Sequence, residues 1–444
     1  MFGFRKVRTP LTTFQRVDVE LLMRRTIDEV GRAFVRQAHV VTNLEELKLD
    51  HTSLDTLVET ARAEVVSRLP EQQTQCEVQI VPGSEIGYPS TYSVATESSP
   101  AIIRVAKETG DDPLRTVMEL AFQFSSHHWH VVPGATELDK LPRTSDLLPI
   151  CCGFGVLGSE ACLYDDQWSQ AGWAGWSISR SGYYSTVEIG YALALFARCR
   201  NESNPEWAER LRLDSRETAE LAWKLFETRD KSGDGLLFDA ERIPSTQVDM
   251  SQLATWLSGP DPAYALAAGY ALAKLNGLSP RAVESAIKAS QLSDPDVIPV
   301  AVRVLGKART CTPDLEKCVL DLCRKSKPRV TVAAMQAAVE LNLPLLSYRR
   351  KLSKLLGYFA GDPSPILELI GSQGKALKML APRIMPRLAL AVRDEDENLV
   401  DACLGCLRRI DADTERLIPR FIKAEESREQ VRQRLEELEI VPTQ

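Results

Sequence analysis

The chain has 444 residues, of which 44% are hydrophobic and 26% are charged. This composition is typical of a folded globular protein and excludes a disordered or fibrous chain. The longest mostly apolar run, residues 147–158, is shorter than the ~20 residues that a membrane-spanning helix needs. The N-terminus, MFGFRKVRTP, carries charges where a secretory signal would be apolar. We therefore expect a soluble, cytoplasmic protein of two or three domains, without membrane contact.

Charge divides the chain into two parts. Residues 251–444 contain 28 Lys and Arg against 24 Asp and Glu, a balance of +4, so the net charge of −7 leaves −11 for residues 1–250. The first part is rich in Trp, Tyr and Gly and has strand-like runs, whereas the second has few aromatic residues and a helical pattern throughout. The sequence predicts two domains, 1–250 and 251–444.

The first part predicts an α+β domain. Residues 10–70 have the apolar spacing of two or three amphipathic helices. The runs CEVQIVP at 76–82 and AIIRVAK at 101–107 are typical of strands. A further helix is expected after Asp112, because Pro113 suits the first helical turn. Helices, a small sheet and more helices in this order indicate an α+β fold.

Three segments carry a resemblance to a known family. They are PLTTFQRV near the start, DLLPICCGFGVLGS at 146–159 and SRSGYYSTVEIGYALALFARCRNE at 179–202. In these segments, residues 10–240 resemble a group of bacterial proteins that have a zincin-like, metallopeptidase-type domain. The resemblance implies a zincin-like fold for the first domain.

The resemblance also implies a site that has lost its ligands. Family members hold Zn²⁺ with a His-Glu-x-x-His helix, whose Glu polarises the metal-bound water. The matching positions here are Met118, Glu119 and Phe122, so only the Glu is kept. The third ligand position falls at Pro142, or at Arg143 if the loop shifts by one residue. The resemblance therefore implies a pseudoenzyme with no catalytic residue.

A displaced metal site is an alternative. His127 and His130 are three residues apart and share a helix face, and Asp146 or Asp139 would supply a third ligand. This set would make the protein a metal-dependent hydrolase. The opposing interpretation is a polar helix end, where His is favourable against the helix dipole.

Residues 230–241, DKSGDGLLFDAE, match the calcium loop of an EF-hand. Positions 1, 3, 5, 7 and 12 of the loop are Asp230, Ser232, Asp234, Leu236 and Glu241. Pro244 interrupts the helix that should follow, and an Asp- and Gly-rich turn explains the same residues. Calcium-regulated binding is therefore a second alternative.

The second part predicts a helical repeat. Helix starts recur at intervals of 33, 33, 35 and about 34 residues. They are Asp261-Pro262, Asp294-Pro295, Lys327-Pro328, Asp362-Pro363 and Glu395-Asp396. One helical pattern follows each start, and a second helical pattern comes after it. One helical pair cannot bury its apolar stripe alone, so the pairs must stack. We expect a mainly α protein whose second domain resembles a HEAT-like solenoid.

This pattern also predicts which side chains are buried. Leu305, Val332, Ala338 and Leu407 should lie between repeats, and Arg303, Lys325 and Arg350 should face solvent. Basic residues cluster at 303–329 and 349–354, which indicates either a surface for an acidic partner or a solvated outer face. Interspersed acidic residues and few aromatic ones make a nucleic-acid partner unfavourable.

Two smaller features have competing interpretations. Cys403 and Cys406 form a CxxC within a helical pattern, which favours two buried residues on one helix face over a zinc pair. The Trp- and Tyr-rich stretch 168–184 is either a binding surface or a loop packed on the next helix.

Together these features predict a non-catalytic scaffold without a cofactor, which binds a protein partner through its helical repeats. The alternatives are the metal-dependent hydrolase and the calcium-regulated binder described above. The sequence indicates no oligomeric state.

Overall fold

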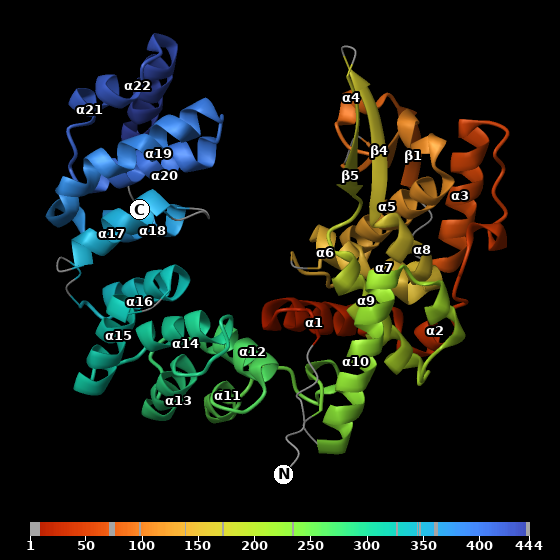
Figure 1. Ribbon diagram of the computed structural model, residues 1–444, viewed down its shortest axis with the longest axis horizontal. Helices are drawn as coiled ribbons and strands as arrows, with labels where there is room; N and C mark the ends of the chain where they lie inside the picture. Colours follow the sequence, from red (N-terminus) through yellow and green to blue (C-terminus); the bar gives the residue numbers. More distant parts are fainter. Residues whose placement is uncertain are drawn as a thin grey trace. The chain divides into compact units, whose positions relative to one another are not determined.

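The computed structural model describes residues 9–70, 76–96, 99–137, 139–170, 173–232, 235–325, 327–343, 345, 348–358 and 363–440. The chain forms two compact units, Met1–Glu241 and Arg242–Gln444 (Figure 1). The boundary predicted from charge, 250/251, lies nine residues further along the chain. None of the helices in the described ranges is long and apolar enough to cross a membrane.

Unit 1 combines helices with a small sheet and a hairpin. Its strands are β1 (Cys76–Val81), β2 (Ser90–Ser93), β3 (Ala101–Ala106), β4 (Leu163–Gln170) and β5 (Trp173–Arg180). Its helices are α1 (Thr13–Val30), α2 (Arg32–Gln37), α3 (Leu54–Arg68), α4 (Gly83–Ile86), α5 (Pro113–Val131), α6 (Pro142–Ser145), α7 (Leu147–Pro149), α8 (Gly155–Ala161), α9 (Thr186–Arg200) and α10 (Leu213–Ser232). Short 3-10 turns are η1 (Leu44–Glu46), η3 (Lys107–Asp111), η5 (Glu206–Arg210) and η6 (Leu237–Asp239), and η4 (Ile150–Phe154) is a π-helical turn.

The sheet is mixed. Strand β3 lies in the centre, parallel to β1 and antiparallel to β2, with Cys76 opposite Ala101 and Ser90 opposite Val105. The sequence predicted β1 and β3 because both are apolar, whereas the short polar β2 was missed. Strands β4 and β5 form a separate antiparallel hairpin that overlaps the Trp- and Tyr-rich stretch 168–184.

Helix α5 packs against both the sheet and neighbouring helices. Asp112 caps its first turn by accepting a hydrogen bond from the Arg115 amide, with Pro113 in the first position as predicted. Its buried face packs on β2, β3, α3 and α8. The functional positions of α5 therefore stand on a helix held from several sides.

A second core joins α1, α9 and α10. Gly190 lets α9 approach α10 closely, because a Cβ at this position would lie 2.3 Å from the Ser215 carbonyl oxygen. Buried Glu20 of α1 accepts hydrogen bonds from the Tyr191 hydroxyl and the Phe238 amide and pairs with Arg16. This carboxylate joins α1 to α9 and to η6.

Unit 2 is helical over its described residues, apart from an isolated bridge between Leu278 and Ala308. Its helices are α11 (Met250–Leu257), α12 (Pro262–Ala273), α13 (Pro280–Ser290), α14 (Val297–Gly306), α15 (Pro313–Lys325), α16 (Pro328–Glu340), α17 (Arg349–Tyr358), α18 (Ser364–Ser372), α19 (Ala381–Arg393), α20 (Glu397–Arg409), α21 (Thr414–Phe421) and α22 (Glu425–Ile440), with a 3-10 segment η8 (Gly374–Leu380).

The helices of unit 2 pack in a regular order. Helices α12, α14, α16, α18 and α20 contact one another in sequence, and α11, α13 and α15 form a second series beside them (Figure 1). The bounds of the helices agree with most of the predicted helix starts. The structure shifts two starts, because α14 begins at Val297 rather than Pro295 and α18 begins at Ser364 rather than Pro363.

Ion pairs connect equivalent positions 33 residues apart. They join Lys307 to Glu340, Arg329 to Asp296, Lys378 to Asp411 and Arg434 to Asp401. Because the 33-residue spacing equals the predicted distance between successive helix starts, each ion pair joins one pair of helices to the next.

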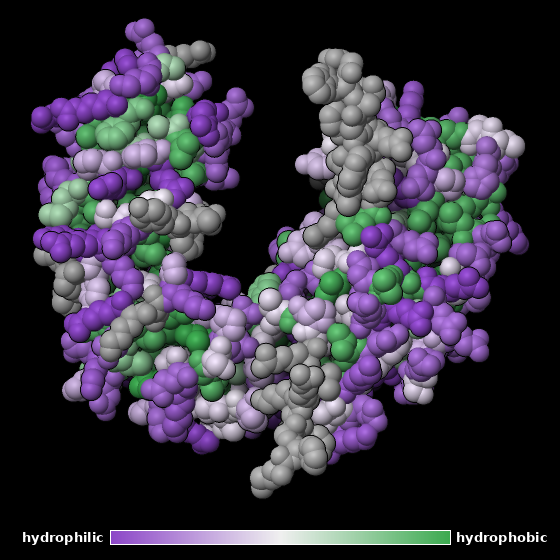
Figure 2. Space-filling view, viewed as in Figure 1, coloured by the Kyte–Doolittle hydropathy of each residue, from purple (hydrophilic) through white to green (hydrophobic). Residues whose placement is uncertain are grey.

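The predicted burial in unit 2 is confirmed. Leu305, Ala338 and Leu407 are fully buried and Val332 is nearly so, while Arg303 and Arg350 are exposed. The Lys325 side chain lies outside the described residues. Figure 2 shows hydrophilic residues over much of the visible surface of this unit, with apolar residues between them.

The basic clusters of the sequence do not form one strip. Arg303 lies on α14, Lys317 and Arg324 on α15, and Arg350 and Lys354 on α17. Helices α14 and α15 belong to different series, so basic residues that are close in the sequence are divided between the two series. The Lys351 ammonium donates to the Arg324 carbonyl, which links α15 to α17.

Candidate functional site

One face of α5 lines a cavity of about 420 Å³ in unit 1. The helix contributes Glu119, Phe122, Gln123 and Ser126 to its wall. These residues recur at intervals of three and four, as expected for one helix face. The remaining wall comes from the segments before β2, around α6 and after β5.

Glu119 has both carboxylate oxygens satisfied by the protein. The Ser181 hydroxyl donates to Oε1 and the Ser90 hydroxyl donates to Oε2, each at 2.5 Å. Ser90 in turn accepts a hydrogen bond of 2.8 Å from the Gln123 amide. Because the Glu119 side chain is buried, these short bonds from hydroxyls to a carboxylate hold it firmly.

Asp146 lies in the same cavity but acts on the backbone. Its Oδ2 accepts hydrogen bonds from the Tyr183 and Tyr184 amides. Gly182 makes this approach possible, since its φ is +78° and a Cβ there would lie 2.8 Å from the same oxygen. The sequence motif Ser-Gly-Tyr-Tyr is therefore the turn that receives the Asp146 carboxylate.

The positions implied for zinc ligands do not fit the metal. Phe122 and Pro142 line the cavity with apolar side chains. Met118 is fully buried in the core, where its terminal methyl carbon lies 3.4 Å from a Cβ built on Gly158. Zinc sites in proteins use imidazole, thiolate and carboxylate donors. The donor set near Glu119 therefore lacks the ligands of the family pattern.

The alternative histidine set is not assembled either. His127 Nδ1 is hydrogen-bonded to the Tyr92 hydroxyl at 3.0 Å, and His130 Nδ1 lies 2.7 Å from the Ser126 carbonyl oxygen. Burial, and then the charge of His130, lower the pKa of His127. Over the described ranges, no three His, Cys, Asp or Glu side chains are grouped so that they could hold a metal ion. His127, His130 and Asp146 are thus not brought together.

The predicted calcium loop has a different arrangement. Asp230 and Ser232 end α10, and the Asp230 carboxylate forms two hydrogen bonds with the Arg198 guanidinium. This pairing lowers the pKa of Asp230. Leu236 is buried and Glu241 is exposed, while Asp234 lies outside the described residues. The short turn η6 follows in place of the expected exiting helix.

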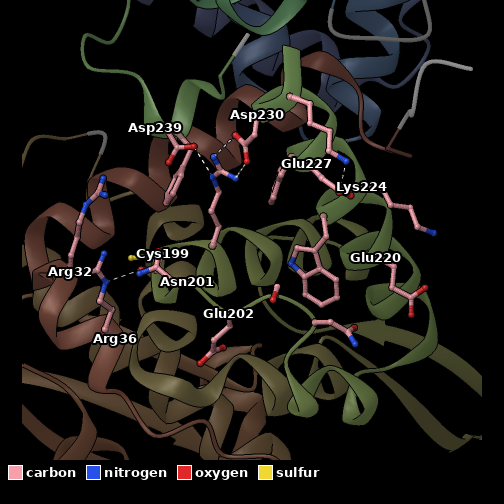
Figure 3. Close-up of a pocket in the computed structure, with 17 residues that line it drawn as sticks. Arg32, Arg36, Cys199, Asn201, Glu202, Glu220, Lys224, Glu227, Asp230 and Asp239 are labelled. Carbon is pink, nitrogen blue, oxygen red and sulfur yellow. Dashed lines mark hydrogen bonds and ion pairs between the residues drawn. The ribbon is translucent and has the colours of Figure 1, made fainter. Parts of the chain in front are cut away.

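Arg198 stands in a wider hollow of about 1140 Å³ (Figure 3). Arg32 and Arg36 of α2 lie on one side of it, and Glu220 and Lys224 of α10 on the other. The Arg36 guanidinium donates a hydrogen bond to the Cys199 carbonyl oxygen. Arg198 also forms an ion pair with Asp239 of η6. The charges of this hollow are of both signs, so it selects no one class of ligand.

Cys403 and Cys406 are both fully buried on α20. Burial raises the pKa of each thiol to about 12, which favours the neutral form that packs as an apolar group. Within the aromatic stretch, Tyr184 is buried and donates to Asp18, whereas Tyr183 is exposed. The Trp side chains of 168–176 lie outside the described residues.

Sequence reasoning missed the two serines that bind Glu119. Ser90 and Ser181 are 29 and 62 residues away from it in the chain. Ser181 belongs to a segment that carries the family resemblance, but no local pattern connects it with α5.

Comparison with known proteins gives no relative: no family model, no curated protein and no solved structure matches this chain.

Proposed function

We propose that this protein is a non-catalytic interaction scaffold, in which an inactive zincin-like core precedes a HEAT-like helical-repeat solenoid. The observation that carries the proposal is the state of Glu119. Its carboxylate is bound by two serine hydroxyls, and its neighbours at the ligand positions are apolar or thioether side chains. A glutamate in this position of a metallopeptidase acts on metal-bound water, for which this donor set provides no ligands.

The buried carboxylate has a structural use instead. Through Ser90 and Ser181 it joins α5 to the start of β2 and to the segment after β5. An unpaired buried carboxylate would cost several kcal/mol, so the two hydroxyls support its retention. In this proposal the core of unit 1 has a structural role and no catalytic one.

The interaction role rests on unit 2. Its helices stack in two series, and repeated ion pairs join equivalent positions. Such arrays present long, continuous surfaces to protein partners. We therefore assign partner binding to the helical unit.

The first test is the metal content and peptidase activity of the purified full-length protein. We expect neither zinc nor calcium in stoichiometric amount, and no hydrolysis of a denatured protein substrate. One zinc per chain, with hydrolysis abolished by Glu119→Gln, would overturn the proposal. Zinc lost on His127→Ala and His130→Ala would favour the displaced-site hydrolase, and a calcium-dependent rise in melting temperature lost on Asp230→Ala would favour the calcium-regulated binder.

A restoring variant tests the zincin-like part by itself. We expect Met118→His, Phe122→His and Pro142→Glu together to bind about one zinc per chain, because they return the three ligands of the family pattern. The matched control is Met118→Leu, Phe122→Leu and Pro142→Ala, which alters the same positions without adding a ligand. Circular dichroism shows whether each variant folds. A folded restoring variant that takes up no more zinc than the control would reject the zincin-like framework.

A further inference from the structure

A groove of about 540 Å³ crosses the first helical series of unit 2. Helices α12, α14, α16 and α18 each line part of it. Tyr270, Arg303 and Gln336 occupy equivalent positions at 33-residue intervals, and so do Lys274 and Lys307. The groove is therefore built by the repeat itself rather than by one irregular loop.

The charges along the groove are ordered. Lys274, Arg303 and Lys307 lie at the α12–α14 end, and Glu340 and Glu368 lie at the α16–α18 end. The centre is neutralised, because the Lys307 ammonium and the Glu340 carboxylate form an ion pair of 2.7 Å. What remains is a positive end and a negative end.

The end charges have no partner within the described chain. Lys274, Arg303 and Glu368 are exposed, and none of them forms an ion pair or side-chain hydrogen bond with a described residue. Each can therefore pair with a bound molecule without first breaking a native ion pair.

Between the ends the wall combines apolar side chains with the Lys307–Glu340 ion pair and the amide of Gln336. Ala337, Val339 and Leu369 contribute apolar surface. Gln336 adds an amide that likewise has no partner in the described residues. An amide both donates and accepts, which suits the N–H and C=O groups of an extended peptide backbone.

Resting on the proposed interaction function, we propose that this groove holds an extended segment of a partner protein, with acidic side chains at one end and a basic side chain at the other. The acidic end lies over α12 and α14, and the basic end lies over α18. Packed helices are 8–10 Å apart, so α14 and α18 are separated by roughly 16–20 Å. An extended chain covers this distance in about five or six residues.

The test uses fluorescent synthetic peptides and the full-length protein. The probe peptide has two Asp, a centre of four uncharged residues including Leu and Val, and two Lys. Its controls have the same composition with the charges in reverse order or mixed. We expect the probe and its reverse-order form, which both have one acidic and one basic end, to bind at least tenfold more tightly than the mixed-charge peptide. Their affinity should fall as salt is added. Equal affinity for dipolar and mixed peptides would overturn the proposal.

Charge-reversal variants of the protein show where the peptide binds and which end of the groove holds its acidic side chains. We expect Arg303→Glu to weaken the probe at least tenfold, and a peptide with Lys in place of both Asp to recover binding to this variant. Glu368→Lys should be rescued in the same way by Glu in place of both Lys. The matched control is Arg350→Glu on α17, which makes the same charge change outside the groove and should leave affinity unchanged.

Other outcomes have distinct meanings. If Arg303→Glu changes the oligomeric state measured by sedimentation, a second copy of the chain covers the groove and the peptide assignment is wrong. If rescue fails while the protein still lacks zinc and peptidase activity, the groove assignment fails and the scaffold proposal stands. Stoichiometric zinc with hydrolysis would remove the scaffold proposal instead, whatever the peptides do.

Discussion

Leu305 provides a direct measure of how unit 2 is held together. This side chain is fully buried on α14, a helix that contacts α12, α13 and α16. Because helices enclose it on several sides, the site has little freedom to collapse after truncation. Leu→Ala changes in such cores cost about 2–5 kcal/mol, so we expect Leu305→Ala to cost about 3–4 kcal/mol. Leu305→Asp adds the burial of a charge and should unfold the unit, whose total stability is of the order of 5–15 kcal/mol.

Urea denaturation followed by two signals separates the units. Six of the seven Trp residues precede residue 242, and Trp256 is the single one in unit 2. Fluorescence therefore reports mainly on unit 1, while far-ultraviolet circular dichroism reports on all helices. With an m-value of about 2–3 kcal/mol per molar urea, Leu305→Ala should lower the dichroism midpoint of unit 2 by roughly 1 M or more. The fluorescence midpoint serves as the internal control.

The comparison variant is Arg350→Asp on α17, whose side chain is exposed. Surface changes of this kind usually alter stability by less than ~0.5 kcal/mol. Equal midpoints for wild type and Leu305→Ala, or equal losses in Leu305→Ala and Arg350→Asp, would refute the assignment of Leu305 to a dry interface between helical pairs.

Two further predictions concern unit 1. Gly190→Ala should destabilise it by about 1–3 kcal/mol, because the added Cβ would meet the Ser215 carbonyl oxygen at 2.3 Å; Gly405→Ala, where a Cβ meets no atom within 4 Å, should be neutral or stabilising in the same denaturation assay. Burial, followed by the charges of His127 and Arg25, lowers the pKa of His128 to about 4. The unfolded chain, with a His pKa near 6.5, then binds more protons between pH 6.5 and 4, so stability should fall by up to about 3 kcal/mol as pH drops through this window. His128→Gln should flatten this dependence in pH-resolved melting, whereas His51→Gln at an exposed site should not.

Local signals allowed the helices of unit 2 to be predicted. Asp261 with Pro262, and Asp396 before Glu397, cap and start α12 and α20 at the predicted positions. Such caps act within one helical turn, so they can be recognised from adjacent residues. The apolar strands β1 and β3 were recognisable for a similar reason.

Contacts between distant segments were not predictable in this way. The Ser90 and Ser181 bonds to Glu119 depend on how β2 and the segment after β5 fold onto α5. Closeness in sequence is likewise no guide to closeness in space, since Arg303 and Lys317 lie on α14 and α15, helices of different series. The periodicity of apolar residues and the capping residues predict single helices and strands. The arrangement around Glu119 depends on tertiary packing, which these local signals do not show.

Unit 2 uses its charges in two ways, which lets binding be separated from folding. Paired charges such as Asp401 with Arg434 join one helix to another, in this case α20 to α22. The charges at the ends of the groove, Arg303 and Glu368, have no partner among described residues. Reversal of an unpaired exposed charge removes no native contact, so Arg303→Glu and Glu368→Lys should retain the wild-type melting curve. Loss of peptide affinity in these variants can therefore be attributed to the groove itself, since the helices that form it remain folded.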